Sequence, residues 1–155
     1  MEPLSTELLS FILDEQRFAI PLGSVERVLR ALAVTHIPDA PPLVHGVIDY
    51  HGEIVVVINL RNHLKMEDRN IQLNDRFIII NTSNRKLTLV VDEVQEVLKH
   101  SEKDISTADD INQGLKITGI LRDDRGIIFI YDLEKLLKHI EGINLKELLE
   151  SEVAA

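Results

Sequence analysis

The sequence predicts a mainly β fold in which two small, similar β-barrel subdomains pack side by side, with short helices and a C-terminal helix. Short β-branched runs alternate with turn signals along the 155-residue chain, as is typical of all-β folds. One run, residues 54–58, is apolar at every position and is expected to be buried on both faces. Two halves of about 70 residues repeat the same order of elements, which predicts two related subdomains.

A tight hairpin at residues 44–60 is the clearest local prediction. Its two strands are separated only by His51 and Gly52. Tight hairpin turns need positive φ, which glycine adopts freely and histidine tolerates better than most residues. Three more hairpins are predicted from similar runs: residues 8–14 with 17–21, 76–82 with 86–91 around a turn at 83–85, and 117–121 with 126–131.

Two short helices are predicted where apolar spacing follows a capping residue. In residues 24–31, Ser24 is the expected N-cap, and apolar side chains follow at i, i+3 and i+4. In residues 92–100, Asp92 is expected to cap a helix in the same way.

The remaining segments are predicted from residues that break, start or end helices. Residues 61–66 form a helical turn, residues 132–140 form a helix that Gly142 ends, and a last helix starts at Asn144. Residues 35–42 hold three prolines and are predicted to be an extended connector. Residues 101–114 are polar and acidic, and we expect a mobile loop.

The internal repeat sets the expected domain organisation. Val25-Glu-Arg-Val-Leu matches Val94-Gln-Glu-Val-Leu at a shift of 69, and Gly46 matches Gly119 at a shift of 73. We expect one domain over residues 1–155. It would comprise two β subdomains, at about residues 15–80 and 81–140 plus the N-terminal strand, followed by a helical tail over 141–155.

Charge and composition exclude several classes of partner and compartment. A net charge of −9 argues against nucleic acid or an anionic membrane surface. The chain has no cysteine, so disulfides and thiolate chemistry are excluded. No apolar run approaches the roughly 18 residues of a membrane-spanning helix. We therefore expect a cytoplasmic protein without direct membrane insertion.

The titratable residues give no positive sign of an active or metal site. Histidines stand at 36, 45, 51, 63, 100 and 139 without i, i+4 pairs. His45 and His51 could share a strand face, but no third ligand is in register, so surface histidines are the preferred interpretation. Acidic pairs at 109–110 and 123–124 are interpreted as solvated turns. We expect no catalytic residues, cofactor or metal; a metal-dependent enzyme is the alternative from another class.

Five segments, in order along residues 8–137, resemble the CheW-like domain of bacterial and archaeal chemotaxis. They are Phe-Ala-Ile-Pro-Leu-x-x-Val (18–25), Ile-Pro-x-Ala-Pro (37–41), Gly-Val-Ile-x-x-x-Gly-x-Ile-x-x-Val-Ile-x-Leu-Arg (46–61), Leu-Val-Val-Asp-x-Val-x-x-Val-Leu (89–98) and Asp-Leu-Glu-Lys-Leu-Leu (132–137). The resemblance implies two SH3-like five-stranded subdomains. It also implies a non-catalytic adaptor that couples chemoreceptor cytoplasmic tips to the regulatory domain of a CheA-type histidine kinase. The alternative is a similar interaction module used in a different signalling system.

In the family, a groove between the subdomains takes the receptor helix and barrel surfaces contact the kinase. Two departures fall on this partner surface: the usual hairpin turn Asn-Leu-Arg-Gly is here Asp49-Tyr50-His51-Gly52, and the usual Val-x-Glu-Val is here Val-Glu-Arg-Val at 25–28. The predicted partner-binding residues are Val25, Arg27, Val28, Gly46, Asp49, Tyr50, His51, Gly52 and Ile54.

Overall fold

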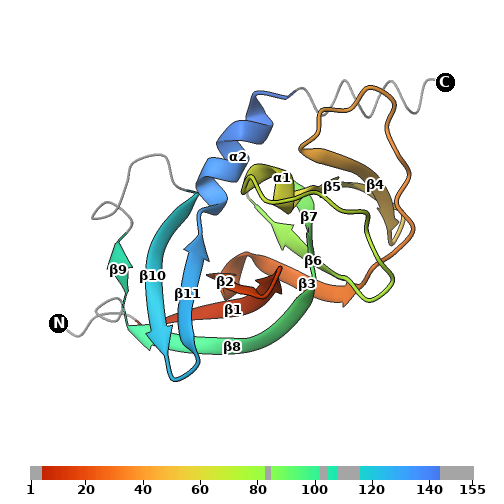
Figure 1. The fold of residues 1–155 in the computed structure, drawn as a ribbon. Helices are drawn as coiled ribbons and strands as arrows, with labels where there is room; N and C mark the ends of the chain where they lie inside the picture. Colours follow the sequence, from red (N-terminus) through yellow and green to blue (C-terminus); the bar gives the residue numbers. More distant parts are fainter. Residues whose placement is uncertain (1–4, 83–84, 102–104, 108–115, 144–155) are drawn as a thin grey trace.

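The computed structural model describes residues 5–82, 85–101, 105–107 and 116–143, which form two β-sheets packed on a shared core (Figure 1). The five-stranded sheet has the order β3 (Val25–Arg30), β6 (Arg76–Asn81), β7 (Lys86–Val91), β5 (Glu53–Ile58) and β4 (Val44–Tyr50). The six-stranded sheet has the order β8 (Glu93–Ser101), β1 (Ser5–Leu13), β2 (Gln16–Pro21), β11 (Gly126–Tyr131), β10 (Ile117–Asp123) and β9 (Ser106–Thr107). The predicted two-subdomain β fold is confirmed, with a two-residue sixth strand.

Each half of the chain contributes its first hairpin to the sheet of the other half. The β1–β2 hairpin lies between β8 and β11, and the β6–β7 hairpin lies in the equivalent place between β3 and β5. The strand pairing therefore joins segments of both expected subdomains, at about 15–80 and 81–140 plus the N-terminal strand, within each sheet. The β2 strand belongs to the six-stranded sheet, and β6 and β7 both belong to the five-stranded sheet. A sequence repeat shows which segments are equivalent, but not which copy each segment pairs with.

Two predicted helices are wrong, because their residues form β3 and β8. Only Leu22–Ser24 makes a short 3-10 turn before β3. Each strand carries an extra residue, between Val25 and Arg27 in β3 and between Val94 and Val97 in β8. Such a bulge shifts the alternation of side chains by one position, so residues three apart share a face and imitate helical spacing. Asp92 is consequently not a helix cap.

The hairpins and the later helix follow the sequence prediction. The 44–60 hairpin forms β4 and β5, and α2 (Leu133–Glu141) starts after Asp132, whose side chain accepts from the Lys135 amide. The shorter α1 (Leu60–His63) starts after Asn59 in the same way. The end of α2 at Gly142 is also confirmed. The predicted turn at 83–84, most of the loop at 101–114 and the helix from Asn144 lie outside the described residues.

Both faces of β5 are buried over residues 55–58, as predicted, whereas Ile54 at the start of the predicted run is exposed. Val56 and Ile58 face the large core that both sheets share, whereas Val55 and Val57 face a smaller core within the five-stranded sheet. Leu133, Leu136 and Ile140 of α2 add to the shared core. No helix within the described ranges is long and apolar enough to cross a membrane.

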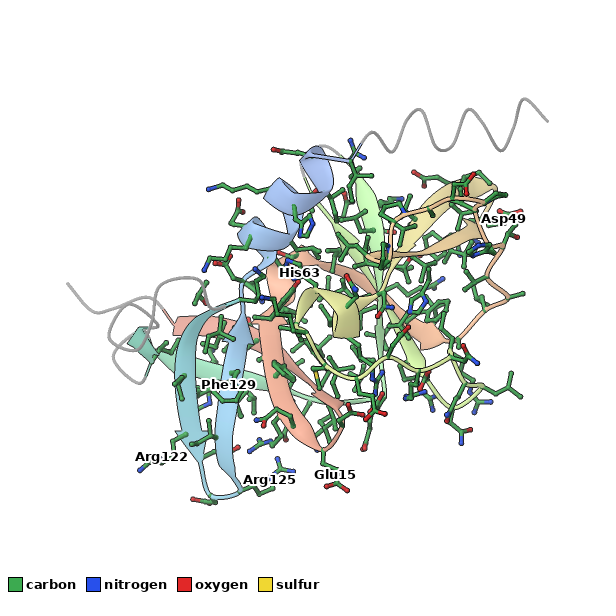
Figure 2. All side chains as sticks on the ribbon, turned by 45° about the horizontal axis from the view of Figure 1, so that its top comes forward. Glu15, Asp49, His63, Arg122, Arg125 and Phe129 are labelled. Carbon is green, nitrogen blue, oxygen red and sulfur yellow. The ribbon has the colours of Figure 1, made fainter. Side chains whose placement is uncertain are left out.

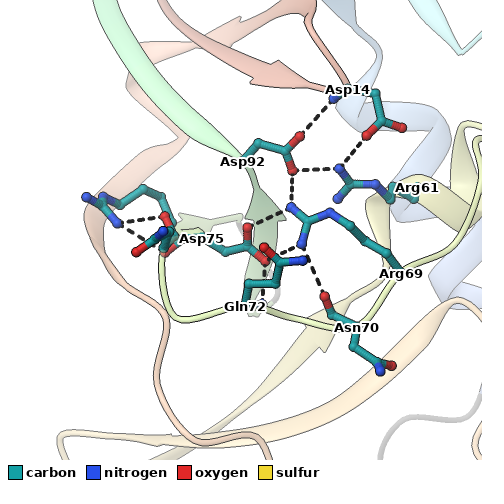
Figure 3. A network of polar contacts seen from close by, with 9 residues as sticks. Asp14, Arg61, Arg69, Asn70, Gln72, Asp75 and Asp92 are labelled. Atoms are coloured by element: carbon teal, nitrogen blue, oxygen red, sulfur yellow. Dashed lines mark hydrogen bonds and ion pairs between the residues drawn. The ribbon is translucent and has the colours of Figure 1, made fainter.

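An ion-pair network stands where the chain crosses from one sheet to the other (Figure 3). Asp92, between β7 and β8, lies 2.6 Å from Arg61 of α1 and 2.5 Å from Arg69. Arg61 also lies 2.9 Å from Asp14 in the β1–β2 turn, whose amide donates to Asp92. Burial would raise the pKa of Asp92, but the Asp14 amide and the two guanidinium groups hold it below its usual value. The network therefore fixes the crossover to both sheets.

A buried histidine makes a second contact between the two sheets. His63, at the end of α1, is 3% exposed and its Nδ1 is hydrogen-bonded to the hydroxyl of Tyr131 in β11. Burial raises the pKa of Tyr131, so its hydroxyl stays protonated and donates to Nδ1. Burial, together with the charges of Lys116 and His139, lowers the pKa of His63 to about 4. His63 is therefore neutral in the folded protein at physiological pH.

We expect Arg61→Met to lower the free energy of unfolding by about 2 kcal/mol, because the half-buried Asp92 and the exposed Asp14 both lose the charged donor that they share. Urea unfolding measures the change. The matched control is Arg125→Met, which removes the exposed Arg125–Glu96 pair and is expected to cost about 0.5 kcal/mol or less. Equal losses from the two substitutions would contradict a structural role for the network.

We expect acid to destabilise the protein through His63. An unfolded histidine takes up a proton near pH 6.5, whereas folded His63 does so near pH 4. The unfolded state thus binds more protons between these values, so stability falls as pH falls from about 6.5 to 4, by an amount on the order of 3 kcal/mol. Unfolding measured across this range should show a flatter pH dependence for His63→Gln. The exposed His36 provides the control: His36→Gln should keep the wild-type slope, and identical slopes for all three proteins would exclude His63 as the cause.

Candidate interaction surface

The predicted partner residues come from β3, from β4, from the turn after it and from the start of β5. The β3 and β4 strands are the two edge strands of the five-stranded sheet. Their residues come together because the sheet curves and brings its two edges close to each other. Five of them line one cavity of about 560 Å³, together with Leu29 and Leu32. We call this cavity the seam pocket; its lining is Arg27, Val28, Leu29, Leu32, Asp49, Tyr50 and His51.

The β4–β5 turn presents its side chains through a fixed backbone geometry. His51 and Gly52 both have positive φ, of 53° and 82°, as a type I′ hairpin turn requires. The Asp49 carboxylate accepts a 2.8 Å hydrogen bond from the Gly52 amide. The Tyr50 ring packs edge-on against the His51 ring, with centroids 4.5 Å apart. The predicted turn is confirmed.

The two residues that depart from the family pattern touch each other. Nη1 of Arg27 lies 3.1 Å from Nε2 of His51. Because a guanidinium only donates, Nε2 must be the acceptor, so the ring is neutral and carries its proton on Nδ1. The sequence shows the two departures 24 positions apart, and only the curvature of the sheet brings them together.

Four predicted residues are not among those that line the seam pocket: Val25, Gly46, Gly52 and Ile54. Gly46 is buried in β4, and this corrects its predicted place on the partner surface. Its φ is +153°, and a Cβ there would stand 2.2 Å from the Thr35 carbonyl oxygen, so glycine is needed for chain packing. Val25 is half-buried against the shared core, while Ile54 is exposed beside the turn.

A larger apolar groove lies elsewhere, and sequence analysis missed it. It measures about 790 Å³ and lies between the six-stranded sheet and the end of α1. Figure 2 shows Phe129, which lines this groove, far from Asp49 at the seam pocket. Its other apolar lining residues are Phe18, Leu64, Met66, Ile117 and Ile120. The sequence pattern places each of these residues in a predicted strand or turn. A cavity between distant segments leaves no local pattern, so the sequence does not predict this groove.

Several titratable residues are buried or engaged in structural contacts. The Arg17 guanidinium lies 2.6 Å from Asp123 and holds the pKa of that carboxyl well below its usual range. His45 is half-buried, and burial lowers its pKa. In the described part of the chain, no three histidine or acidic side chains are grouped so that they could hold a metal ion.

Comparison with known proteins identifies the family. The sequence model of the CheW-like domain matches residues 7–141. The chain is 30% identical over 142 residues to the chemotaxis protein CheW of Thermotoga maritima, with 91% of each chain covered. It is 25% identical over 142 residues to the chemotaxis protein CheW of Treponema pallidum, covering 87% of this chain and 84% of the relative.

A solved structure agrees with these sequence matches. The scaffolding protein TtCheW from Thermoanaerobacter tengcongensis superposes with a TM-score of 0.75 at 26% identity, covering 83% of this chain and 89% of that one. The residues matched by the family model include the candidate surface and strands of both sheets. This chain therefore belongs to the CheW-like domain family.

Proposed function

We propose that this protein is a non-catalytic chemotaxis adaptor in the cytoplasm that couples chemoreceptor cytoplasmic tips to the regulatory domain of a CheA-type histidine kinase. Membership of the CheW-like family supports the coupling role. The relatives are named as chemotaxis and scaffolding proteins, which favours assembly over catalysis.

A pair of exposed aliphatic residues at equivalent places in the repeat is the observation that carries this proposal. Val28 on β3 is 37% exposed and Val97 on β8 is 49% exposed. The preceding Val25 and Val94 are half-buried against the core that both sheets share. The two bulged strands, each at one end of its sheet, therefore present exposed aliphatic side chains. An amphipathic receptor helix could bury its apolar face against such side chains.

The β4–β5 tip offers a surface for the kinase that adjoins Val28 at the seam pocket. Asp49, His51, Gly52 and Ile54 are exposed on it, and Tyr50 is half-buried. An adaptor has to hold two partners at once. The aliphatic strand faces fit a receptor helix, and the exposed hairpin tip fits a folded regulatory domain. Barrel-to-barrel contact through a hairpin tip with one exposed isoleucine is consistent with this division.

A CheW-like module serving a different signalling system is the second candidate. The observation that favours it is the contact between Arg27 and His51, since the two residues replace the family's usual glutamate and arginine on the partner surface. Binding of another signalling partner, with no binding to the cognate kinase or receptor, would select this candidate.

We expect the double substitution Val28→Lys and Val97→Lys to weaken binding to a cognate receptor tip fragment by about a hundredfold, because two buried aliphatic contacts become desolvated ammonium groups. Isothermal titration calorimetry measures the affinity. The matched control is Ile127→Lys, which changes a 44% exposed residue on β11 and should leave the affinity unchanged. If wild-type protein binds neither the receptor tip nor the kinase regulatory domain at tens of micromolar, the adaptor function is wrong.

A further inference from the structure

The seam pocket combines an aliphatic wall with a cation in a strongly acidic protein. Val28 and Leu32 are exposed along it, and Leu29 is half-buried below them. Arg27 extends from the β3 edge to the His51 ring across the pocket. The chain as a whole carries a net charge of −9, so a cation exposed in a concave apolar surface is a local exception.

Arg27 has no carboxylate partner among the described residues. The neighbouring acids are engaged elsewhere: Lys86 lies 3.3 Å from Glu26 and 3.1 Å from Glu53. Asp49 lines the same pocket, but its carboxylate caps the hairpin turn and makes no ion pair with Arg27. The positive charge of Arg27 is therefore not neutralised within the described part of the chain.

His51 orients this charge without cancelling it. Its neutral Nε2 accepts from one guanidinium nitrogen, which leaves the other donors of Arg27 free to face the pocket. A carboxylate at the same place would form an internal ion pair and would compete with any incoming anion. An imidazole acceptor therefore holds the guanidinium in position and keeps it available to a carboxylate from outside.

We propose that the seam pocket binds an acidic segment of the partner protein, in which a carboxylate pairs with Arg27 and an adjacent aliphatic side chain packs on Val28 and Leu32. This inference rests on the proposed adaptor function and gives the chemistry of one partner contact. The whole chain repels an acidic partner at long range, so the contact selects partners by fit at the pocket and not by electrostatic steering. Arg27 is a specificity-determining residue, and His51 is its positioning residue.

The test measures the affinity of the full chain for the cognate kinase regulatory domain and for a receptor tip fragment, by calorimetry at one fixed salt concentration. His51→Asp and His51→Asn form the matched pair, because both residues tolerate positive φ and differ only in charge. We expect H51D to weaken binding to one of the two probes about tenfold, since it supplies an internal anion to Arg27, and H51N to stay within about threefold of wild type.

Charge reversal at Arg27 gives the second arm. R27E should weaken the same probe at least about tenfold, whereas R30E, on an exposed cation of the same strand outside the pocket, should not. Reversing a partner carboxylate to lysine should restore binding to R27E. Thermal unfolding checks that all variants fold. If the wild-type protein binds a probe and H51D and R27E bind it with unchanged affinity, the seam-pocket proposal is wrong and the adaptor function stands. If the wild-type protein binds neither probe, both the adaptor function and the seam-pocket proposal are wrong.

Discussion

The exchange of hairpins between the two halves is the constraint on which the rest of the structure depends. Each sheet obtains two of its inner strands from the opposite half, so neither sheet can be completed by its own repeat. The chain must then pass from β7 in one sheet to β8 in the other, and Asp92 stands at that passage with Arg61, Arg69 and Asp14 around it. Folding of one subdomain therefore requires the other, and residues of both subdomains form the large core.

The same exchange decides where the exposed edges fall. With the inner positions occupied by swapped hairpins, β3 and β8 take equivalent positions at the outer ends of the two sheets. Both strands bulge at the equivalent place, and just past the bulge Val28 is 37% exposed and Val97 is 49% exposed. Ser10 supports the bulge in β8, since its hydroxyl accepts from the Glu96 amide and donates to the Glu96 carbonyl. Surfaces suited to partners thus arise from the same geometry that completes the core.

Local patterns in the sequence predict the hairpins, the capped α2 helix and the buried part of β5, because each depends on residues close together in the chain. The two bulged strands could not be recognised, since one extra residue turns a period of two into a helix-like spacing. The exchange of hairpins and the Arg61–Asp92 pair depend on long-range pairing, for which a single sequence holds no local signal. Of the nine residues predicted for partner binding, five line the seam pocket, while Gly46 is buried.

The contact between Arg27 and His51 shows how two separate sequence departures become one physical change. In a family whose usual residues at these positions are an acid and an arginine, the pair can neutralise itself. Here the strand contributes the cation and the turn contributes a neutral acceptor, so the positive charge persists at the pocket. In the proposed interaction, the matching carboxylate comes from the partner protein. The exchange of residue types therefore leaves the fold unchanged and alters the chemistry that a partner must offer.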